Sequence, residues 1–173
     1  SRAFLVGGKG FIHFDGFHSR LFGQTNEGGR WPLHQGGVFH LYKSRNIEIT
    51  RCFNDGRGGS YSAPLVQAAE TDGLQVRNSV AIVNAGAIRL SACPNTVIEN
   101  NVILRSNIQN IIGANHEGEM IRLRNNILGD NQLSKAHVQT FEMGRTTTMD
   151  EGNNCYFFRI ADEKRKPYLF GDL

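Results

Sequence analysis

One short pattern recurs along the chain and constrains its fold more than any other feature. The pattern is apolar, any residue, apolar, any residue, a polar or small pair, and an apolar residue, and its clearest copy runs from Ile121 to Ile127. The other copies lie at 12–17, 47–53, 74–80, 96–102 and, in decayed form with Glu151 breaking the alternation, 149–155. The first members of the pairs are 35, 27, 22, 25 and 28 residues apart. Period-two alternation predicts strands, and the irregular spacing predicts a fixed rung plus loops of variable length.

A second strand-like segment precedes each copy. These segments are 38–42, 65–68, 87–90, 108–112 and 138–141. Short turns join each segment to its copy, and longer links follow the copies at 18–36, 54–63 and 129–136. Coils of about 22 residues that stack at roughly 4.8 Å per rung produce parallel sheets. The sequence therefore predicts an all-β parallel β-helix, or β-solenoid, of about five to six coils.

The polar pair of the repeat indicates how each coil turns. In the best copies it consists of two asparagines: Asn100-Asn101, Asn125-Asn126 and Asn153-Asn154. Asparagine tolerates left-handed dihedral angles and bonds nearby backbone groups, and stacked asparagines bond one another along an axis. We therefore expect Asn78, Asn100 and Asn125 to align along the axis, and the stacked asparagines of the pairs to form a ladder. The simpler alternative is that asparagine only marks turns.

The pattern over residues 4–157 resembles the right-handed parallel β-helix proteins of the pectin-lyase-like superfamily. The segment Phe11-Ile12-His13-Phe14-Asp15-Gly16-Phe17 resembles the opening coil of many such proteins. The resemblance implies a right-handed helix with a substrate groove along one sheet, walled by the long loops. That superfamily includes polysaccharide lyases, glycoside hydrolases, esterases, epimerases, phage tailspikes and adhesins, so the fold alone does not decide the reaction.

The repeats also predict the domain organisation. The coils occupy 1–160, with long loops at 18–36 and 54–63, and 161–173 forms a charged C-terminal tail or packing arm. The open edges of a β-helix need caps, yet the chain enters directly as the strand-like Phe4-Leu5-Val6. We therefore expect the chain to be a fragment of a longer β-helix, with further coils of the same parent chain as partners.

Composition excludes two classes of partner. The net charge of +3, from 19 basic and 16 acidic residues, is too small to indicate a nucleic-acid binder. No apolar run approaches the roughly 20 residues of a membrane span. The three cysteines, Cys52, Cys93 and Cys155, lack zinc-site spacing and allow one disulfide at most, and we expect buried free thiols.

The resemblance assigns the groove to the sheet that follows the long loops. Alternation directs His40, Tyr42, Gln67, Arg89 and Ser91 outward on that sheet, and we expect Asn110 and Gln139 to continue the row. Such a row can bond sugar hydroxyls and, through Arg89, a uronate carboxylate. Alternatively, these are ordinary solvated strand residues.

The long loops add candidate binding residues. The loop 18–36 carries Trp31, the only tryptophan, between Arg30 and His34, and the next loop carries Arg57 and Tyr61. An exposed tryptophan can stack on a pyranose ring, so we expect these loops to wall one polysaccharide groove; alternatively, Trp31 anchors its own loop.

Three functions remain open. A lyase needs a base and a cation beside a uronate, and Arg89 with His40 or Tyr42 could supply them. Hydrolysis needs two carboxylates and is less favoured, because the groove face offers none in register except Glu70 and Glu142. The alternatives are a non-catalytic carbohydrate-binding or structural module of a surface or phage protein, and a subdomain whose catalytic residues lie on other coils. For all of them we expect a secreted, periplasmic or cell-surface location.

The remaining polar residues suggest no cofactor. His116, Glu117 and Glu119 could bind Ca²⁺, but they are too few to predict a site, so no metal is expected. Arg77, Glu99 and Arg124 occupy one outward column on another face, which we interpret as a structural ladder of ion pairs.

Overall fold

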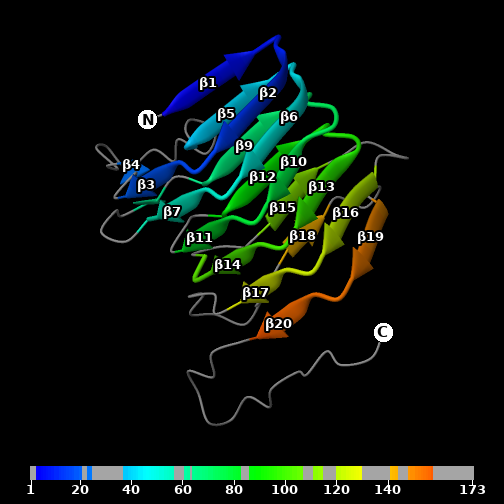
Figure 1. The fold of residues 1–173 in the computed structure, drawn as a ribbon. Helices are drawn as coiled ribbons and strands as arrows, with labels where there is room; N and C mark the ends of the chain where they lie inside the picture. The colour runs from blue at the N-terminus through cyan, green and yellow to red at the C-terminus, as the bar shows by residue number, and fades with distance from the viewer. Residues whose placement is uncertain are drawn as a thin grey trace.

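In the computed structural model, the described residues form six coils that stack into a parallel β-helix (Figure 1). The structure describes residues 3–20, 23–24, 37–56, 61–62, 64–82, 86–106, 111–114, 120–129, 141–143 and 148–157. Each coil contributes one strand to each of three six-stranded parallel sheets, which we call A, B and C in chain order. The predicted parallel β-helix is confirmed, at the upper end of the expected number of coils.

The strands of sheet A are β1 (Phe4–Gly7), β5 (Phe39–Tyr42), β9 (Val66–Ala69), β12 (Ile88–Ser91), β15 (Ile111–Ala114) and β18 (Phe141–Met143). Sheet B contains β2 (Gly10–Asp15), β6 (Arg45–Thr50), β10 (Gln75–Arg77), β13 (Thr96–Glu99), β16 (Met120–Arg124) and β19 (Thr148–Gly152). Sheet C contains β3 (His18–Arg20), β7 (Phe53–Asp55), β11 (Val80–Ile82), β14 (Val102–Leu104), β17 (Ile127–Gly129) and β20 (Cys155–Phe157).

Two strand positions differ from the sequence prediction. The strands expected at 108–112 and 138–141 lie later, at β15 and β18. The shift places Ile111 in the buried column formed by Phe39, Val66 and Ile88, and the stacking of these side chains sets the register. The predicted loops also begin too early, because β3 takes up the first residues of 18–36 and β7 the first of 54–63.

Apolar side chains fill the interior in columns that run along the axis. Seven residues expected in the core are 0% exposed: Ile47, Ile49, Leu74, Val76, Ile98, Ile121 and Leu123. The columns follow the strand register, so that Ile49, Val76, Ile98 and Leu123 stack on four consecutive coils. The core is thus the inner face of three sheets, as the period-two pattern predicts.

The turn between sheets B and C is made by the first member of each polar pair. Arg51, Asn78, Asn100, Asn125 and Asn153 all have φ between 51° and 58°, the left-handed region that asparagine tolerates. The backbone N–H groups of the first four donate to carbonyls of the next coil, for example Asn100 N to Arg124 O at 3.2 Å. The predicted alignment of Asn78, Asn100 and Asn125 is therefore confirmed.

The asparagine ladder itself is formed by the second member of each pair. The backbone N–H of Ser79 donates to Oδ1 of Asn101 at 2.9 Å, and that of Asn126 donates to Oδ1 of Asn154 at 2.9 Å. The predicted ladder of stacked asparagines therefore forms, and it falls on the second members because a left-handed residue at the outside of the bend turns the next side chain into the interior. Ser79, Asn101 and Asn126 are accordingly buried.

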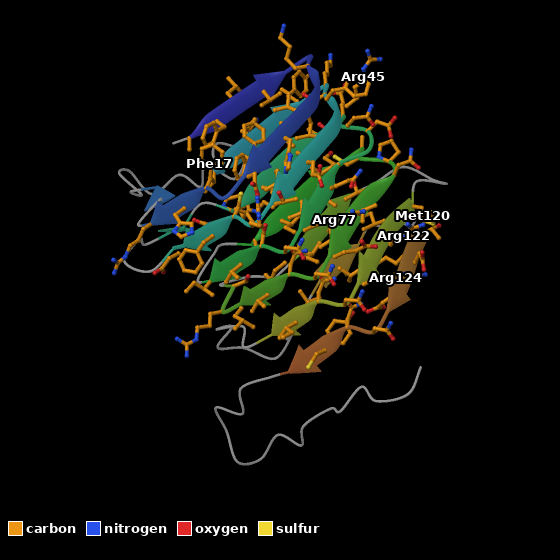
Figure 2. All side chains as sticks on the ribbon, in the orientation of Figure 1. Phe17, Arg45, Arg77, Met120, Arg122 and Arg124 are labelled. Carbon is orange, nitrogen blue, oxygen red and sulfur yellow. The ribbon has the colours of Figure 1, made fainter. Side chains whose placement is uncertain are left out.

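Sheet B carries the predicted charged face. Arg77 forms an ion pair with Glu99 at 3.6 Å, and Asp150 accepts hydrogen bonds from Arg122 Nε at 3.1 Å and Arg124 at 2.5 Å. Figure 2 shows the three arginines along one side of the stack. Exposed pairs of this kind contribute about 0–1 kcal/mol each, which fits a structural role.

The two ends of the stack differ in chemistry. In the first coil Phe4, Phe14 and Phe17 pack around Phe39 with ring centroids 4.8–6.2 Å apart, and Phe17 remains 40% exposed. At the other end, the buried column that passes through Leu123 finishes at Glu151. Glu151 is classed as exposed, and the partial desolvation of its carboxyl in this column raises the pKa of that group.

Candidate functional site

The row predicted on sheet A exists in the structure. The strand register places His40 beside Gln67 and Gln67 beside Arg89, on three consecutive coils at a spacing of about 4.8 Å. Their neighbours along each strand, such as Phe39, Val66 and Leu90, point into the core. We call His40, Gln67 and Arg89 the polar row.

The continuation of the polar row differs from the prediction. Ile112 pairs with Arg89, and Glu142 pairs with Ile112. The expected Asn110 and Gln139 do not occupy these register positions and lie outside the described residues. The prediction failed because β15 and β18 begin later than expected, and the sequence of the preceding loops does not indicate where these strands begin.

The members of the polar row are only partly exposed, as are the outward residues Glu48, Gln75 and Val97 of sheet B. His40, Gln67 and Arg89 are all half-buried although they point away from the core. Burial lowers the pKa of the Arg89 guanidinium below its ordinary value, since desolvation disfavours the charged form. The guanidinium still carries its charge at neutral pH and offers a planar set of donors to a carboxylate.

Small side chains fill the adjacent outward column of sheet A, with the exception of one aromatic residue. Gly7, Tyr42, Ala69 and Ser91 lie at equivalent positions on four consecutive coils. Tyr42 is 42% exposed, and the Lys43 ammonium lies 5.0 Å from its ring centroid. Lys43 also pairs with Glu70 at 3.8 Å. An exposed aromatic ring therefore stands beside the polar row, next to small side chains.

The predicted catalytic residues belong to strands of two different coils. His40 and Arg89 lie two rungs apart with Gln67 between them, a separation of about 10 Å at the rung spacing of a parallel sheet. Tyr42 is two residues from His40 on the same strand and therefore shares its face. A base and a cation at this separation would meet different sugar units of an extended chain.

The two long loops meet in a small antiparallel sheet that the sequence did not predict. It consists of β4 (Gly23–Gln24) and β8 (Tyr61–Ser62), with Gln24 paired to Tyr61. The structure describes only the backbone of these strands. The other predicted loop residues, Arg30, Trp31, His34 and Arg57, lie outside the described residues, so their role in binding stays a prediction.

The described residues offer neither a metal site nor a membrane-spanning helix. Within the described ranges, no group of three or more His, Cys, Asp or Glu side chains could hold a metal ion. The Ca²⁺ candidates His116, Glu117 and Glu119 lie outside those ranges. The described part of the chain contains no helix that is long and apolar enough to cross a membrane.

The cysteines divide into two kinds. Cys52 and Cys93 are buried free thiols and Cys155 is an exposed one. Cys52 occupies the ladder column beside Ser79, whose Oγ accepts a hydrogen bond from the Cys52 backbone N–H at 3.1 Å. Burial raises the pKa of the Cys52 thiol, so it acts as a small core residue.

Sequence reasoning missed one surface, the outer face of sheet C. The apolar residue that follows each polar pair points outward: Phe53, Val80, Val102 and Ile127. The residue after it is the one in the core, as in Ile103 and Leu128. The repeat contains the signal for this face. Period-two alternation resumes after the turn, so one of the two residues that follow each polar pair faces outward and the other faces the core.

Comparisons with known proteins do not assign a family. No protein-family model and no curated protein matches the sequence. A solved structure, that of a pentapeptide repeat protein (Rfr23) from the cyanobacterium Cyanothece 51142, aligns with 84% of this chain and 91% of its own at 13% identity, with a TM-score of 0.20. A likeness this weak does not bear on function. The chain is therefore identified by its own architecture, as a six-coil parallel β-helix.

Proposed function

We propose that sheet A binds an extended acidic polysaccharide along the axis of the β-helix. The observation that supports this most is the register of the polar row, which presents an imidazole, an amide and a guanidinium on consecutive rungs. A rung spacing of about 4.8 Å is comparable to the length of one sugar unit in an extended chain. A linear polymer could therefore meet one polar side chain per unit.

Each member of the site has a chemical role in this proposal. The Arg89 guanidinium binds a uronate carboxylate, and its partial burial strengthens that contact because water competes less. Gln67 and His40 exchange hydrogen bonds with hydroxyl groups. Tyr42 offers an exposed ring on which a pyranose can stack, beside a column of small residues that lets the polymer approach the sheet.

Binding without chemistry fits the geometry better than a lyase reaction. β-Elimination requires the base and the charge-stabilising cation at the same sugar unit. The separation of about 10 Å between the backbone positions of His40 and Arg89 favours contacts with different units. The same proposal includes two further points. The chain belongs to the pectin-lyase-like superfamily, and its location is secreted, periplasmic or at the cell surface.

The experiment compares two arginine variants of the whole chain. Binding to polygalacturonate, alginate and a neutral glucan is measured by affinity electrophoresis for the wild type, Arg89→Ala and Arg122→Ala. Arg122 is the matched control, because it also lies in an outward column, on the coil next to that of Arg89, but belongs to sheet B. We expect Arg89→Ala to weaken binding to the acidic polymers by about tenfold or more, the scale of one charged hydrogen-bonded contact, and Arg122→Ala to leave it unchanged.

Three results would count against the proposal. Equal loss in both variants would indicate nonspecific attraction of a polyanion to a cationic surface. Absence of binding to all three polymers would remove the polysaccharide from consideration. Release of an unsaturated product, detected by its ultraviolet absorbance and abolished by Arg89→Ala, would replace binding with lyase catalysis.

A further inference from the structure

Within the described residues, the last coil leaves one edge of sheet A open. The strand order of the sheet ends there at β18. An open edge presents backbone N–H and C=O groups that pair readily with another extended segment. The chain supplies such a segment close to this edge, because residues 158–173 follow directly after β20 of the same coil. These residues lie outside the described ranges.

The sequence at 168–171 repeats the pattern of the sheet A strands. In those strands the first and third residues face the core and the second faces outward, as Phe39, Leu41 and His40 do. The tail offers Tyr168-Leu169-Phe170-Gly171, and the first strand of the sheet is Phe4-Leu5-Val6-Gly7. Both segments therefore read aromatic, leucine, apolar, glycine.

The link before this segment has a length that an earlier coil uses. Residues 158–167 separate β20 from Tyr168, and the equally long link 56–65 separates β7 from β9. The link 56–65 carries the chain from sheet C to sheet A of the next coil. A link of this length is therefore sufficient to return the tail to sheet A.

We propose that residues 168–171 pair with β18 as a seventh parallel strand of sheet A and so cover its open edge. Tyr168 then continues the register column that runs through Phe141, and Phe170 continues the column that runs through Met143. On an earlier coil the same columns contain the buried Ile88 and Leu90. Two aromatic rings added to these columns remove apolar surface from water, which favours the pairing.

Backbone bonding along sheet A is compatible with the proline that precedes the segment. The N–H of the first strand residue donates to the carbonyl of the residue that precedes the strand on the next coil. This bond joins Phe39 to Leu65 at 2.9 Å and Val66 to Ala87 at 3.1 Å. Pro167 stands at the place of Leu65 and Ala87, and proline retains the carbonyl that this bond needs.

Pro167 also suits a strand that has no coil beyond it. At the equivalent place, the Val38 N–H donates to the Pro64 carbonyl of the following coil at 2.9 Å. Proline has no N–H, so Pro167 cannot make this bond to a further coil. Prolines on edge strands discourage pairing with other chains. The proposed strand thus replaces the open edge of β18 with an edge that pairs less readily.

The experiment follows amide hydrogen exchange of the full chain by mass spectrometry. The wild type is compared with Phe170→Asp, which puts a charge in an inward column, and with the matched control Leu169→Asp, since Leu169 faces outward in the proposed strand. We expect the wild-type amides of 141–143 and 168–171 to exchange about tenfold or more slowly than those of an unstructured chain. Phe170→Asp should abolish this protection at 168–171 and lower it at 141–143, and Leu169→Asp should retain both.

A disulfide trap tests the register independently of whether Phe170→Asp folds. In a Cys155→Ser background, Glu142→Cys is combined with Leu169→Cys, which the proposed pairing places about 4.8 Å apart, within the reach of a disulfide. Glu142→Cys with Phe170→Cys is the control, because Phe170 faces the opposite side of the strand. Mild oxidation should crosslink the first pair within one chain about tenfold or more faster than the second. Non-reducing gels and peptide masses provide the measurement.

Exchange at 168–171 as fast as in an unstructured chain overturns the proposal, and so does equal loss of protection in the two aspartate variants. Equal crosslinking of the two cysteine pairs also overturns it, because the pairing fixes which residue faces outward. Crosslinks that join two chains, or protection that rises with protein concentration, would assign the edge of β18 to a segment of a second copy instead.

Discussion

The backbone N–H of Asn101 donates a hydrogen bond to Oδ1 of Asn126, one coil further along the axis, at 3.0 Å. The side-chain amide of Asn101 reaches the same oxygen at 3.1 Å, and the amide of Asn126 in turn donates to the carbonyls of Ile98 and Arg124 at 2.9 Å. Both asparagines are buried. One side chain therefore satisfies backbone groups on two coils, where water cannot replace it.

The first prediction concerns this ladder. Asn126→Ala should lower the free energy of unfolding by about 2–3 kcal/mol, because it leaves the buried Asn101 N–H and the Ile98 carbonyl without this partner. Asn125→Gly is the control, since Asn125 is exposed with φ of 56° and glycine adopts that conformation readily; we expect a change within about 0.5 kcal/mol. Urea unfolding followed by circular dichroism measures both. Equal losses would refute the division of roles between the two pair members.

The second prediction separates the inner and outer faces of one strand. Ile98 is 0% exposed, and its neighbour Val97 is half-buried on the outer face of β13. Ile98→Asp should unfold the protein, because an unpaired charge in the core costs several kcal/mol. Val97→Asp should reduce stability by about 1 kcal/mol or less, the ordinary scale of a surface change. Thermal unfolding of both variants provides the measurement, and a wild-type melting temperature for Ile98→Asp would contradict the core assignment.

The third prediction is a pH dependence. Asp15 accepts hydrogen bonds from Arg51 and Thr50, and Arg51 in particular lowers the pKa of the Asp15 carboxyl to about 2. A lowered pKa in the folded state stabilises the protein above the ordinary value of 3.8, and this contribution disappears as the pH falls toward 2. Asp15→Asn should therefore be less stable than the wild type at pH 5–7, with the difference vanishing near pH 2.

The Arg51→Gln background identifies the cause of that pH dependence. If the ion pair with Asp15 is responsible, Asp15→Asn should have little further effect on stability once Arg51 is replaced. Melting temperatures of the four proteins, measured across the same pH range, complete the cycle. A pH-dependent difference that survives in the Arg51→Gln background would assign the effect to another neighbour, such as Thr50.

The sequence predicted the candidate site only for residues whose direction follows from alternation within a single strand. The outward direction of His40, Gln67 and Arg89 follows from alternation within each strand, and their alignment follows from equivalent places in successive repeats. Asn110 and Gln139 failed as continuations because the loops before β15 and β18 differ in length from the earlier ones. Counting along such loops does not show which residue begins the next strand.

The repeat by itself determined the strands, the coil, the buried columns and the left-handed turns, because each depends on alternation or backbone preference within a few residues. Only the tertiary structure decided which asparagine of each pair bonds along the axis, and that Val80, Val102 and Ile127 face outward. Both depend on how a bend of two residues rotates the chain between sheets B and C. That rotation is selected by hydrogen bonds and side-chain stacking between coils more than 20 residues apart, which no local pattern contains.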